Sequence, residues 1–101
     1  MANLEFLNEI AKIIKKRKLA KPENSYIAEL IAQGLPKISQ KVGEEGVEVV
    51  IAALAENKER LISESADLIF HLMILLDSKG LTLAEVVTEL ENRNKKWTSA
   101  N

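Results

Sequence analysis

The stretch "DLIFHLMILL", Asp67 to Leu76, decides the fold of this 101-residue chain. After Asp67 the residues are apolar at almost every position, and His71 is the one strongly polar side chain before Asp77. A half-buried strand would alternate apolar with polar residues, and a membrane-spanning helix would need about 20 apolar residues. The stretch therefore indicates a helix without a polar face, which is a helix surrounded by protein.

The segments on either side of this stretch have the apolar spacing of helices, and none alternates long enough to predict a sheet. We expect about five helices, over residues 4–18, 26–33, 36–56, 58–78 and 83–96, with a loose tail over 97–101. Ser25, Asn57 and Thr82 are placed to cap the second, fourth and fifth helices. The connections are short, so neighbouring helices should be largely antiparallel. The sequence thus predicts a single all-α domain over residues 1–101, an antiparallel bundle of about five helices.

The apolar fourth helix also bears on the oligomeric state. A five-helix domain of this length has difficulty covering one helix on every side. A homodimer that packs these central helices together would cover it. The alternative is a central helix buried within one chain, and we favour the homodimer.

Composition and charge exclude several classes of protein. Lysine and arginine number 14 against 15 aspartates and glutamates, so the formal net charge of −1 gives no electrostatic footprint for nucleic acid or an anionic membrane. The chain has no cysteine, which excludes disulfides, thiolate chemistry and zinc bound through cysteine. Residues 1–18 lack the basic-then-apolar order of a signal peptide. We expect a soluble, cytoplasmic protein without nucleic-acid or membrane partners.

Two acidic strips are the candidate site. On the third helix, within "QKVGEEGVEVV" at residues 40–50, four charged residues fall within about 100° of one another: Lys41, Glu44, Glu45 and Glu48. On the fourth helix, four polar residues fall within roughly 60°: Arg60, Glu64, Asp67 and His71. Apolar residues flank both strips, whereas a solvated face normally grades into further polar residues. The strips therefore indicate a binding site rather than surface charge.

The strips contain two carboxylate pairs with a spacing of three, Glu45 with Glu48 and Glu64 with Asp67. Residues three apart lie on one face of a helix, and these two helices are expected to be antiparallel neighbours. Four carboxylates brought together would repel one another without a cation, and an oxygen ligand set favours Mg²⁺, or Mn²⁺, over zinc. Lys41, one turn before Glu45, is placed to contact a phosphate as a point charge. The alternative is that all these charges are solvated.

Three segments of the chain resemble one known family. They are "SYIAELIAQGLPKISQKVGEEGVEVVIAAL", "ISESADLIFHLMILL" and "ELENR", at residues 25–54, 62–76 and 89–93. They are similar to the phosphoribosyl-ATP pyrophosphatases, part of the wider MazG-like superfamily of all-α nucleotide pyrophosphohydrolases, and the resemblance covers about residues 4–95. The acidic core is shared by that superfamily and indicates the chemistry better than the substrate. The pieces that favour the histidine-pathway family are Ser25, Tyr26, Gly34, Lys37, "QKVGEE" and "ADLIFH".

The resemblance implies the second step of histidine biosynthesis, in which the α–β phosphoanhydride of phosphoribosyl-ATP is hydrolysed to phosphoribosyl-AMP and pyrophosphate. It implies a homodimer, a small nucleotide substrate and dependence on Mg²⁺. The metal ligands carried over from the family, which are also catalytic candidates, are Glu45, Glu48, Glu64 and Asp67. Glu44 matches the first residue of the EExxE motif and is a further catalytic candidate, placed to orient or deprotonate the attacking water.

Three further residues are candidates for binding the substrate's phosphates: Lys41, Arg93 and His71. Lys41 and Arg93 match positions of the family that contact phosphate, and His71 matches a characteristic position. Taken by itself, however, a lone histidine in an apolar stretch is more typical of a buried histidine bonded to a neighbour than of a ligand.

Two other functions stay open at this point. One is a general house-cleaning nucleotide pyrophosphohydrolase that acts on dUTP or damaged dNTPs. The other is a non-catalytic helical dimer or interaction module whose carboxylates are merely solvated. A substrate panel separates the first from the histidine-pathway reaction, and stabilisation by a divalent cation argues against the second.

Overall fold

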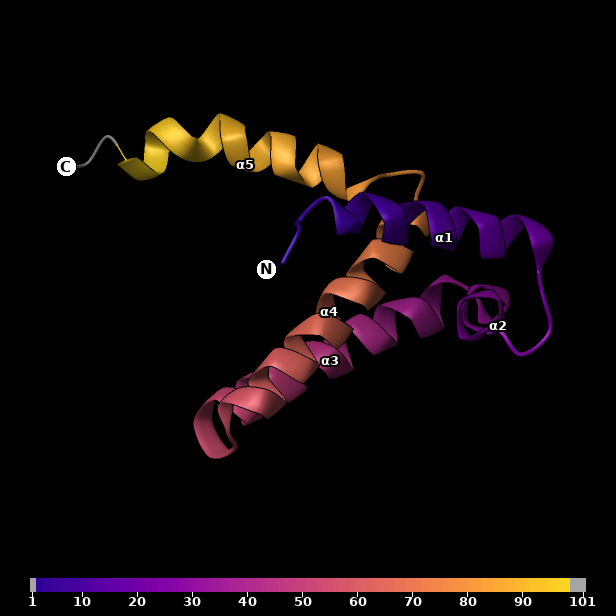
Figure 1. Cartoon of the computed structure of the whole chain (residues 1–101), viewed down its shortest axis with the longest axis horizontal. Helices are drawn as coiled ribbons and strands as arrows, with labels where there is room; N and C mark the ends of the chain where they lie inside the picture. Colours follow the sequence, from indigo (N-terminus) through magenta and orange to yellow (C-terminus); the bar gives the residue numbers. More distant parts are fainter. Residues whose placement is uncertain (1, 99–101) are drawn as a thin grey trace.

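A computed structural model describes residues 2–98, which form five α-helices and no strand (Figure 1). The helices are α1 (Phe6–Ala20), α2 (Tyr26–Gln33), α3 (Leu35–Ala55), α4 (Lys58–Ser78) and α5 (Leu83–Thr98). The predicted all-α class and the number of helices are confirmed. None of the helices in this described part is long and apolar enough to span a bilayer.

The predicted helix starts are confirmed by their hydrogen bonds. The Ser25 hydroxyl accepts from the backbone N–H of Ala28 at 3.1 Å, and the Asn57 side-chain oxygen accepts from that of Arg60 at 2.9 Å. At the start of α5, the backbone N–H of Thr82 donates to the Glu85 carboxylate at 2.8 Å, while that of Glu85 donates to the Thr82 hydroxyl at 3.2 Å. Each bond satisfies a backbone donor that has no partner within its own helix.

Two helix ends differ from the predictions. Helix α1 continues past the basic run to Ala20, since the first breaker is Lys21, with a left-handed φ of 50°, followed by Pro22. Helix α5 continues to Thr98, so the prediction of a loose tail was wrong for residues 97 and 98. No glycine or proline occurs within α5 to end it earlier. The rest of the predicted tail, residues 99–101, lies outside the described residues.

The helices are less regular than the predicted antiparallel bundle. Helices α3 and α4 lie side by side as an antiparallel hairpin, but α1 and α2 cross one end of this hairpin and α5 extends away from it (Figure 1). One cause is the connection between α2 and α3, which is Gly34 alone with a φ of 91°. A single residue with positive φ turns the chain sharply but leaves no length for one helix to fold back along the other.

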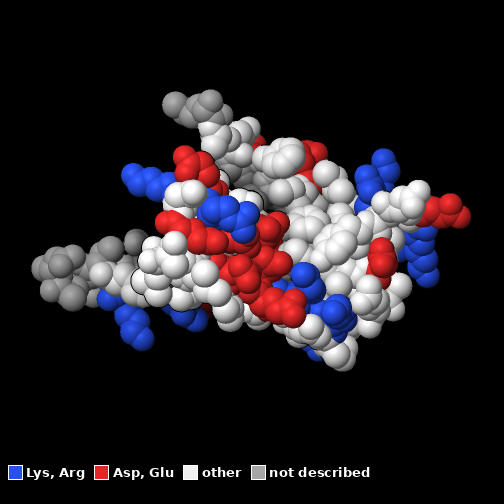
Figure 2. Space-filling view, turned by 90° about the horizontal axis from the view of Figure 1, so that it is seen from below, with Lys and Arg blue, Asp and Glu red and all other residues white. Residues whose placement is uncertain are grey.

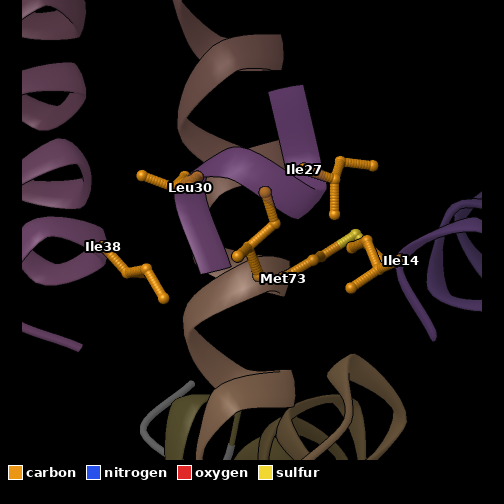
Figure 3. Packing of buried hydrophobic residues seen from close by; sticks show 6 residues of the cluster. Ile14, Ile27, Leu30, Ile38 and Met73 are labelled. Atoms are coloured by element: carbon orange, nitrogen blue, oxygen red, sulfur yellow. The ribbon is translucent and has the colours of Figure 1, made fainter. Parts of the chain in front are cut away.

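The core lies where α1 and α2 meet the hairpin. Its buried side chains come from four helices and point toward one another (Figure 3). They are Ile14, Ile27, Leu30, Ile38, Met73 and Ile74. Full burial of one such side chain stabilises the fold by about 1.5–3 kcal/mol. The core gathers at one end of the hairpin, so residues in the middle of α3 and α4, such as Glu48 and Asp67, stay exposed.

Asp77 adds a polar tie to this core. Its carboxylate is buried at the end of α4 and pairs with two lysines of α1, Lys15 at 3.1 Å and Lys18 at 3.3 Å. A buried carboxylate is tolerated when cations compensate it, and the removal of one partner is then destabilising. The pair fixes α1 across the end of α4.

Candidate functional site

The two acidic strips meet on the open face of the α3–α4 hairpin. Glu45, Glu64 and Asp67 each bring one carboxylate oxygen into a group whose members all lie within 4.8 Å of one another. We call these three residues the carboxylate cluster. Acidic side chains gather in the middle of this face, with lysine and arginine side chains at their border (Figure 2). The prediction that the strips face each other is confirmed for these residues.

The helices explain this convergence. Glu64 and Asp67 are three residues apart on α4 and share a face, and the antiparallel neighbour α3 presents Glu45 to that face. The three residues differ in exposure, because Glu64 is buried at 7% exposed, Glu45 is intermediate and Asp67 is exposed. The cluster is therefore closed to solvent at Glu64 and accessible from solvent at Asp67.

Glu64 has the most perturbed surroundings of the cluster. Burial raises the pKa of its carboxyl group, and the negative charges of Asp67, Glu45 and Glu48 raise it further. The Arg60 guanidinium opposes this rise but does not cancel it. A buried carboxylate among like charges is poorly solvated, and a bound cation would remove this penalty.

Two protein cations border the cluster. The Lys41 ammonium lies 3.5 Å from a Glu45 oxygen and 3.7 Å from a Glu44 oxygen. The Arg60 guanidinium donates to Glu64 at 2.6 Å. For Lys41, burial alone would lower the pKa, but the neighbouring Tyr26 hydroxyl and the charged Glu45 carboxylate outweigh this effect and raise the pKa. Both cations thus partly compensate the carboxylates.

Arg60 belongs to the acidic strip of α4 but was not predicted as a site residue. The available signal was its spacing of four from Glu64 on one helix face, which is a favourable position for an ion pair. Its second ion pair, with Glu56 at 3.8 Å, lies on the other side of the α3–α4 connection.

The remaining predicted acids lie beside the cluster. Glu48 is exposed and stands outside the group of three, yet its charge still acts on Glu64. Glu44 is exposed too, and its carboxylate accepts a hydrogen bond from the Gln40 amide at 2.9 Å. This bond, with the nearby lysines, lowers the pKa of Glu44, so its carboxylate is a weaker base than an ordinary glutamate.

Arg93 lies apart from the other predicted residues. It is an exposed residue of α5, the helix that extends away from the hairpin (Figure 1), and its guanidinium donates to Glu89 one turn earlier at 2.7 Å. The structure of the single chain therefore gives Arg93 a partner on its own helix rather than a place in the cluster.

His71 is buried, at 5% exposed, and both of its ring nitrogens have partners. Nδ1 lies 2.7 Å from the backbone oxygen of Asp67, and Nε2 lies 2.6 Å from the Tyr26 hydroxyl oxygen. The interpretation of His71 as a buried histidine bonded to its neighbours is confirmed. Its two contacts leave no ring nitrogen free for a phosphate.

Tyr26 was not predicted as a site residue. It begins α2, and the charges of Lys41, Glu45 and Asp67 all act on its hydroxyl group, although burial is the largest cause that raises its pKa. Sequence periodicity relates residues within one helix only. It therefore carries no signal for a contact between Tyr26 and His71, which lie 45 residues apart.

The carboxylate cluster fits a hard divalent cation. Mg²⁺ binds oxygen ligands at about 2.0–2.1 Å, so ligands on opposite sides of the ion lie about 4.2 Å apart. The observed limit of 4.8 Å is within a small side-chain adjustment of that distance. The cluster contains carboxylate oxygens alone, a donor set that suits Mg²⁺ or Mn²⁺. An open face with such an ion and two flanking cations is suited to binding phosphate oxygens.

Comparison with known proteins agrees with this chemistry. Residues 7–94 match the model of the family described as phosphoribosyl-ATP pyrophosphohydrolase. The phosphoribosyl-ATP pyrophosphatase of Novosphingobium aromaticivorans is 53% identical over 93 residues, which are 92% of this chain and 87% of that protein. The protein of the same name from Saccharolobus solfataricus is 50% identical over 91 residues, 90% of this chain and 97% of that protein.

A longer relative is also similar. The histidine biosynthesis bifunctional protein HisIE of Photobacterium profundum is 50% identical over 93 residues, which are 92% of this chain and 45% of that protein. The chain thus spans about half the length of this bifunctional relative and most of the length of the two phosphoribosyl-ATP pyrophosphatases. Because the family model covers nearly the whole chain, this protein belongs to the phosphoribosyl-ATP pyrophosphohydrolase family.

Proposed function

We propose that this chain hydrolyses the α–β phosphoanhydride of phosphoribosyl-ATP, giving phosphoribosyl-AMP and pyrophosphate in the second step of histidine biosynthesis. The observation that carries the proposal is the carboxylate cluster of Glu45, Glu64 and Asp67 inside a segment that matches the family over residues 7–94. A cytoplasmic location is part of the same proposal.

We propose Mg²⁺ as the cofactor, with Mn²⁺ as a substitute. Glu45, Glu64 and Asp67 would hold the ion, and Glu48, whose charge acts on Glu64, is the candidate for a fourth ligand. A bound Mg²⁺ supplies neutralisation of charge on the pyrophosphate leaving group and a lowered pKa for a bound water. The raised pKa of Glu64 supports this assignment, because burial and the neighbouring acids disfavour its charged form, which a bound cation would stabilise.

The flanking residues bind and orient the substrate in this proposal. Lys41 lies beside Glu45 and can turn its ammonium group from the carboxylates to a phosphate oxygen. Arg60 has the same possibility beside Glu64. The lowered pKa of Glu44 favours a role in orienting the attacking water over removal of its proton. Arg93 would act from a partner chain or from a different position of α5.

We also propose a homodimer that packs through the central helices. On α3, four exposed apolar residues at helical spacing form a stripe, which we call the α3 stripe: Val47, Val50, Ile51 and Leu54. Leu54 is 84% exposed in the single chain, and α4 has two further exposed isoleucines, Ile62 and Ile69. A contiguous apolar surface of this kind is unusual on a monomer and is typical of an interface.

A substrate panel tests the proposed reaction. Purified protein with Mg²⁺ is given phosphoribosyl-ATP, dUTP and ordinary NTPs, and pyrophosphate release is measured for each. We expect phosphoribosyl-ATP to have the highest kcat/KM, and EDTA to stop the reaction. A preference for dUTP or for damaged dNTPs would instead favour the general nucleotide pyrophosphohydrolase. Absence of hydrolysis on every substrate, and of stabilisation by Mg²⁺, would favour the non-catalytic module.

A further inference from the structure

Tyr26 and His71 form a hydrogen-bonded pair that the proposed reaction does not yet use. The Tyr26 hydroxyl oxygen lies 2.6 Å from His71 Nε2. His71 is buried beneath it, whereas Tyr26 is 48% exposed beside the carboxylate cluster. His71 therefore contacts only protein, whereas Tyr26 is accessible to a ligand.

The direction of this hydrogen bond follows from its neighbours. His71 Nδ1 lies 2.7 Å from the backbone carbonyl oxygen of Asp67, and a carbonyl oxygen only accepts. Nδ1 must then carry the proton, and in the neutral ring Nε2 is an acceptor. The Tyr26 hydroxyl accordingly donates its single proton to His71. Toward a ligand on the exposed side, the Tyr26 hydroxyl oxygen can then act only as a hydrogen-bond acceptor.

The position of this oxygen is fixed by packing. The rings of Tyr26 and His71 meet edge to face with centroids 5.6 Å apart, and the Phe70 ring meets His71 in the same way at 5.4 Å. Phe70 also stacks on Tyr26 at 6.3 Å. The carbonyl that binds His71 belongs to Asp67, a member of the carboxylate cluster. The Tyr26 hydroxyl is therefore fixed in position relative to the cluster, through His71 and the backbone of Asp67.

An acceptor at this place selects its partner by chemistry. Carboxylates and phosphoryl oxygens have no proton to donate, and waters bound to a cation would donate to the charged carboxylates, which are the stronger acceptors. The neutral O–H donors of a nucleotide near its phosphates are the hydroxyls of its sugar. We propose that the Tyr26 oxygen accepts a hydrogen bond from a sugar hydroxyl of the nucleotide substrate, with His71 as the positioning residue that orients the Tyr26 proton. This inference rests on the proposed function, because it places the nucleotide phosphates at the carboxylate cluster.

The first test is spectroscopic. The chain has one histidine, so the imidazole nitrogen signals in an NMR spectrum belong to His71, and their couplings to the ring protons distinguish Nδ1 from Nε2. At a pH where the ring is neutral, we expect a protonated Nδ1 and a bare Nε2, and a change in the Nε2 signal in Tyr26→Phe. A protonated Nε2 in the wild-type protein would overturn the proposal, because Tyr26 would then be free to donate to the site.

The second test is binding of a non-hydrolysable nucleotide. Calorimetry with Mg²⁺ compares α,β-methylene-ATP with its 2′-deoxy and 3′-deoxy forms, in wild type and in Tyr26→Phe, which keeps the ring. We expect Tyr26→Phe to weaken binding of the full analogue by about three- to ten-fold. One deoxy analogue should bind wild type more weakly by a similar factor and should lose nothing further in Tyr26→Phe. If the tyrosine substitution weakens all three analogues equally, no sugar hydroxyl contacts Tyr26.

His71→Asn is the positioning control. Its side-chain amide keeps a donor for the Asp67 carbonyl but offers no acceptor where Nε2 stood. With phosphoribosyl-ATP we expect both variants to raise KM while kcat stays within about two-fold, since the contact acts on substrate binding. If wild type hydrolyses phosphoribosyl-ATP but both variants keep the wild-type KM, the inference fails and the proposed function stands. If wild type does not hydrolyse it but binds the analogue through Tyr26, the proposed function fails and the contact stands.

Discussion

At the scale of single residues, Glu64 combines burial with a place among other carboxylates. Its carboxylate is nearly closed off from solvent, three other acids raise its pKa, and one arginine compensates it in part. Proteins tolerate such a residue where function requires it, since an apolar or neutral side chain would be easier to bury. The free-energy cost of burying the charged Glu64 carboxylate should therefore be measurable as lower stability of the protein without bound metal.

We therefore predict that Glu64→Gln stabilises the metal-free protein at neutral pH. The raised pKa of Glu64 means that the folded state binds its proton more tightly than the unfolded state. The contribution of Glu64 to stability is then present below its unfolded pKa of about 4.3 and is lost as the pH rises through its raised folded pKa. The variant, which has no charge to bury, should gain in melting temperature over wild type across this window.

Glu44→Gln is the matched control for this melting series. The pKa of Glu44 is lowered in the folded state. Its contribution to stability is therefore present above the unfolded pKa and is lost as the pH falls through the folded pKa. The difference between this variant and wild type should have the opposite sign, and it should be small because Glu44 is exposed. A Glu64→Gln variant less stable than wild type by the same margin at every pH would contradict the prediction.

The positions of the candidate site residues could be predicted from the sequence to the extent that they depend on helix geometry. The pairing of Glu64 with Asp67, and their approach to Glu45, follow from spacing on two neighbouring helices. The contact of Tyr26 with His71 joins α2 to α4 and depends on how these helices cross, which spacing within one helix does not encode.

At the scale of helices, hydrogen-bonded caps made the starts more predictable than the ends. Asn57 is an example, because its side chain closes the first turn of α4 just after the chain leaves α3. The helix ends were less predictable, since in the last turn of α1 or α5 no side chain marks the final residue in the same way.

We predict that Asn57→Ala lowers the stability by about 1 kcal/mol, which corresponds to about 4–8 °C in melting temperature for a domain of this size. The reason is the loss of the bond to the Arg60 N–H. Asn57→Gly should lose only a few tenths of that energy, because glycine leaves the backbone N–H open to water. Equal losses in the two variants, measured by thermal melting, would show that the cap bond is not the cause.

At the scale of the whole molecule, the class and the number of helices were predictable, but their arrangement was not. The hydrophobic pattern says which face of a helix is covered, and the crossing of α1 and α2 over the hairpin arises from the single-residue turn at Gly34 and from core packing. The pattern predicted that one chain would not cover the apolar stretch of α4 after Asp67, but only Ile69 of that stretch is exposed, and the uncovered apolar stripe lies on α3 instead.

We predict that the wild-type protein sediments as a dimer and that Val50→Glu, in the middle of the α3 stripe, sediments as a monomer. Val50 is exposed in the single chain, so the substitution should cost the monomer less than about 0.5 kcal/mol. Val87→Glu, at an exposed apolar position of α5, is the control and should remain dimeric. A monomeric wild type, or dissociation caused by Val87→Glu instead, would exclude an interface through the central helices.

The central claim is that the carboxylate cluster holds the cation on which phosphoribosyl-ATP hydrolysis depends. Its most direct test is pyrophosphate release from phosphoribosyl-ATP as a function of Mg²⁺ concentration, in wild type and in Glu45→Gln, with circular dichroism to verify the fold. Loss of a ligand should lower the rate by about 100-fold or more and raise the Mg²⁺ concentration needed. A folded Glu45→Gln variant with the full wild-type rate and the same Mg²⁺ dependence would contradict the assignment.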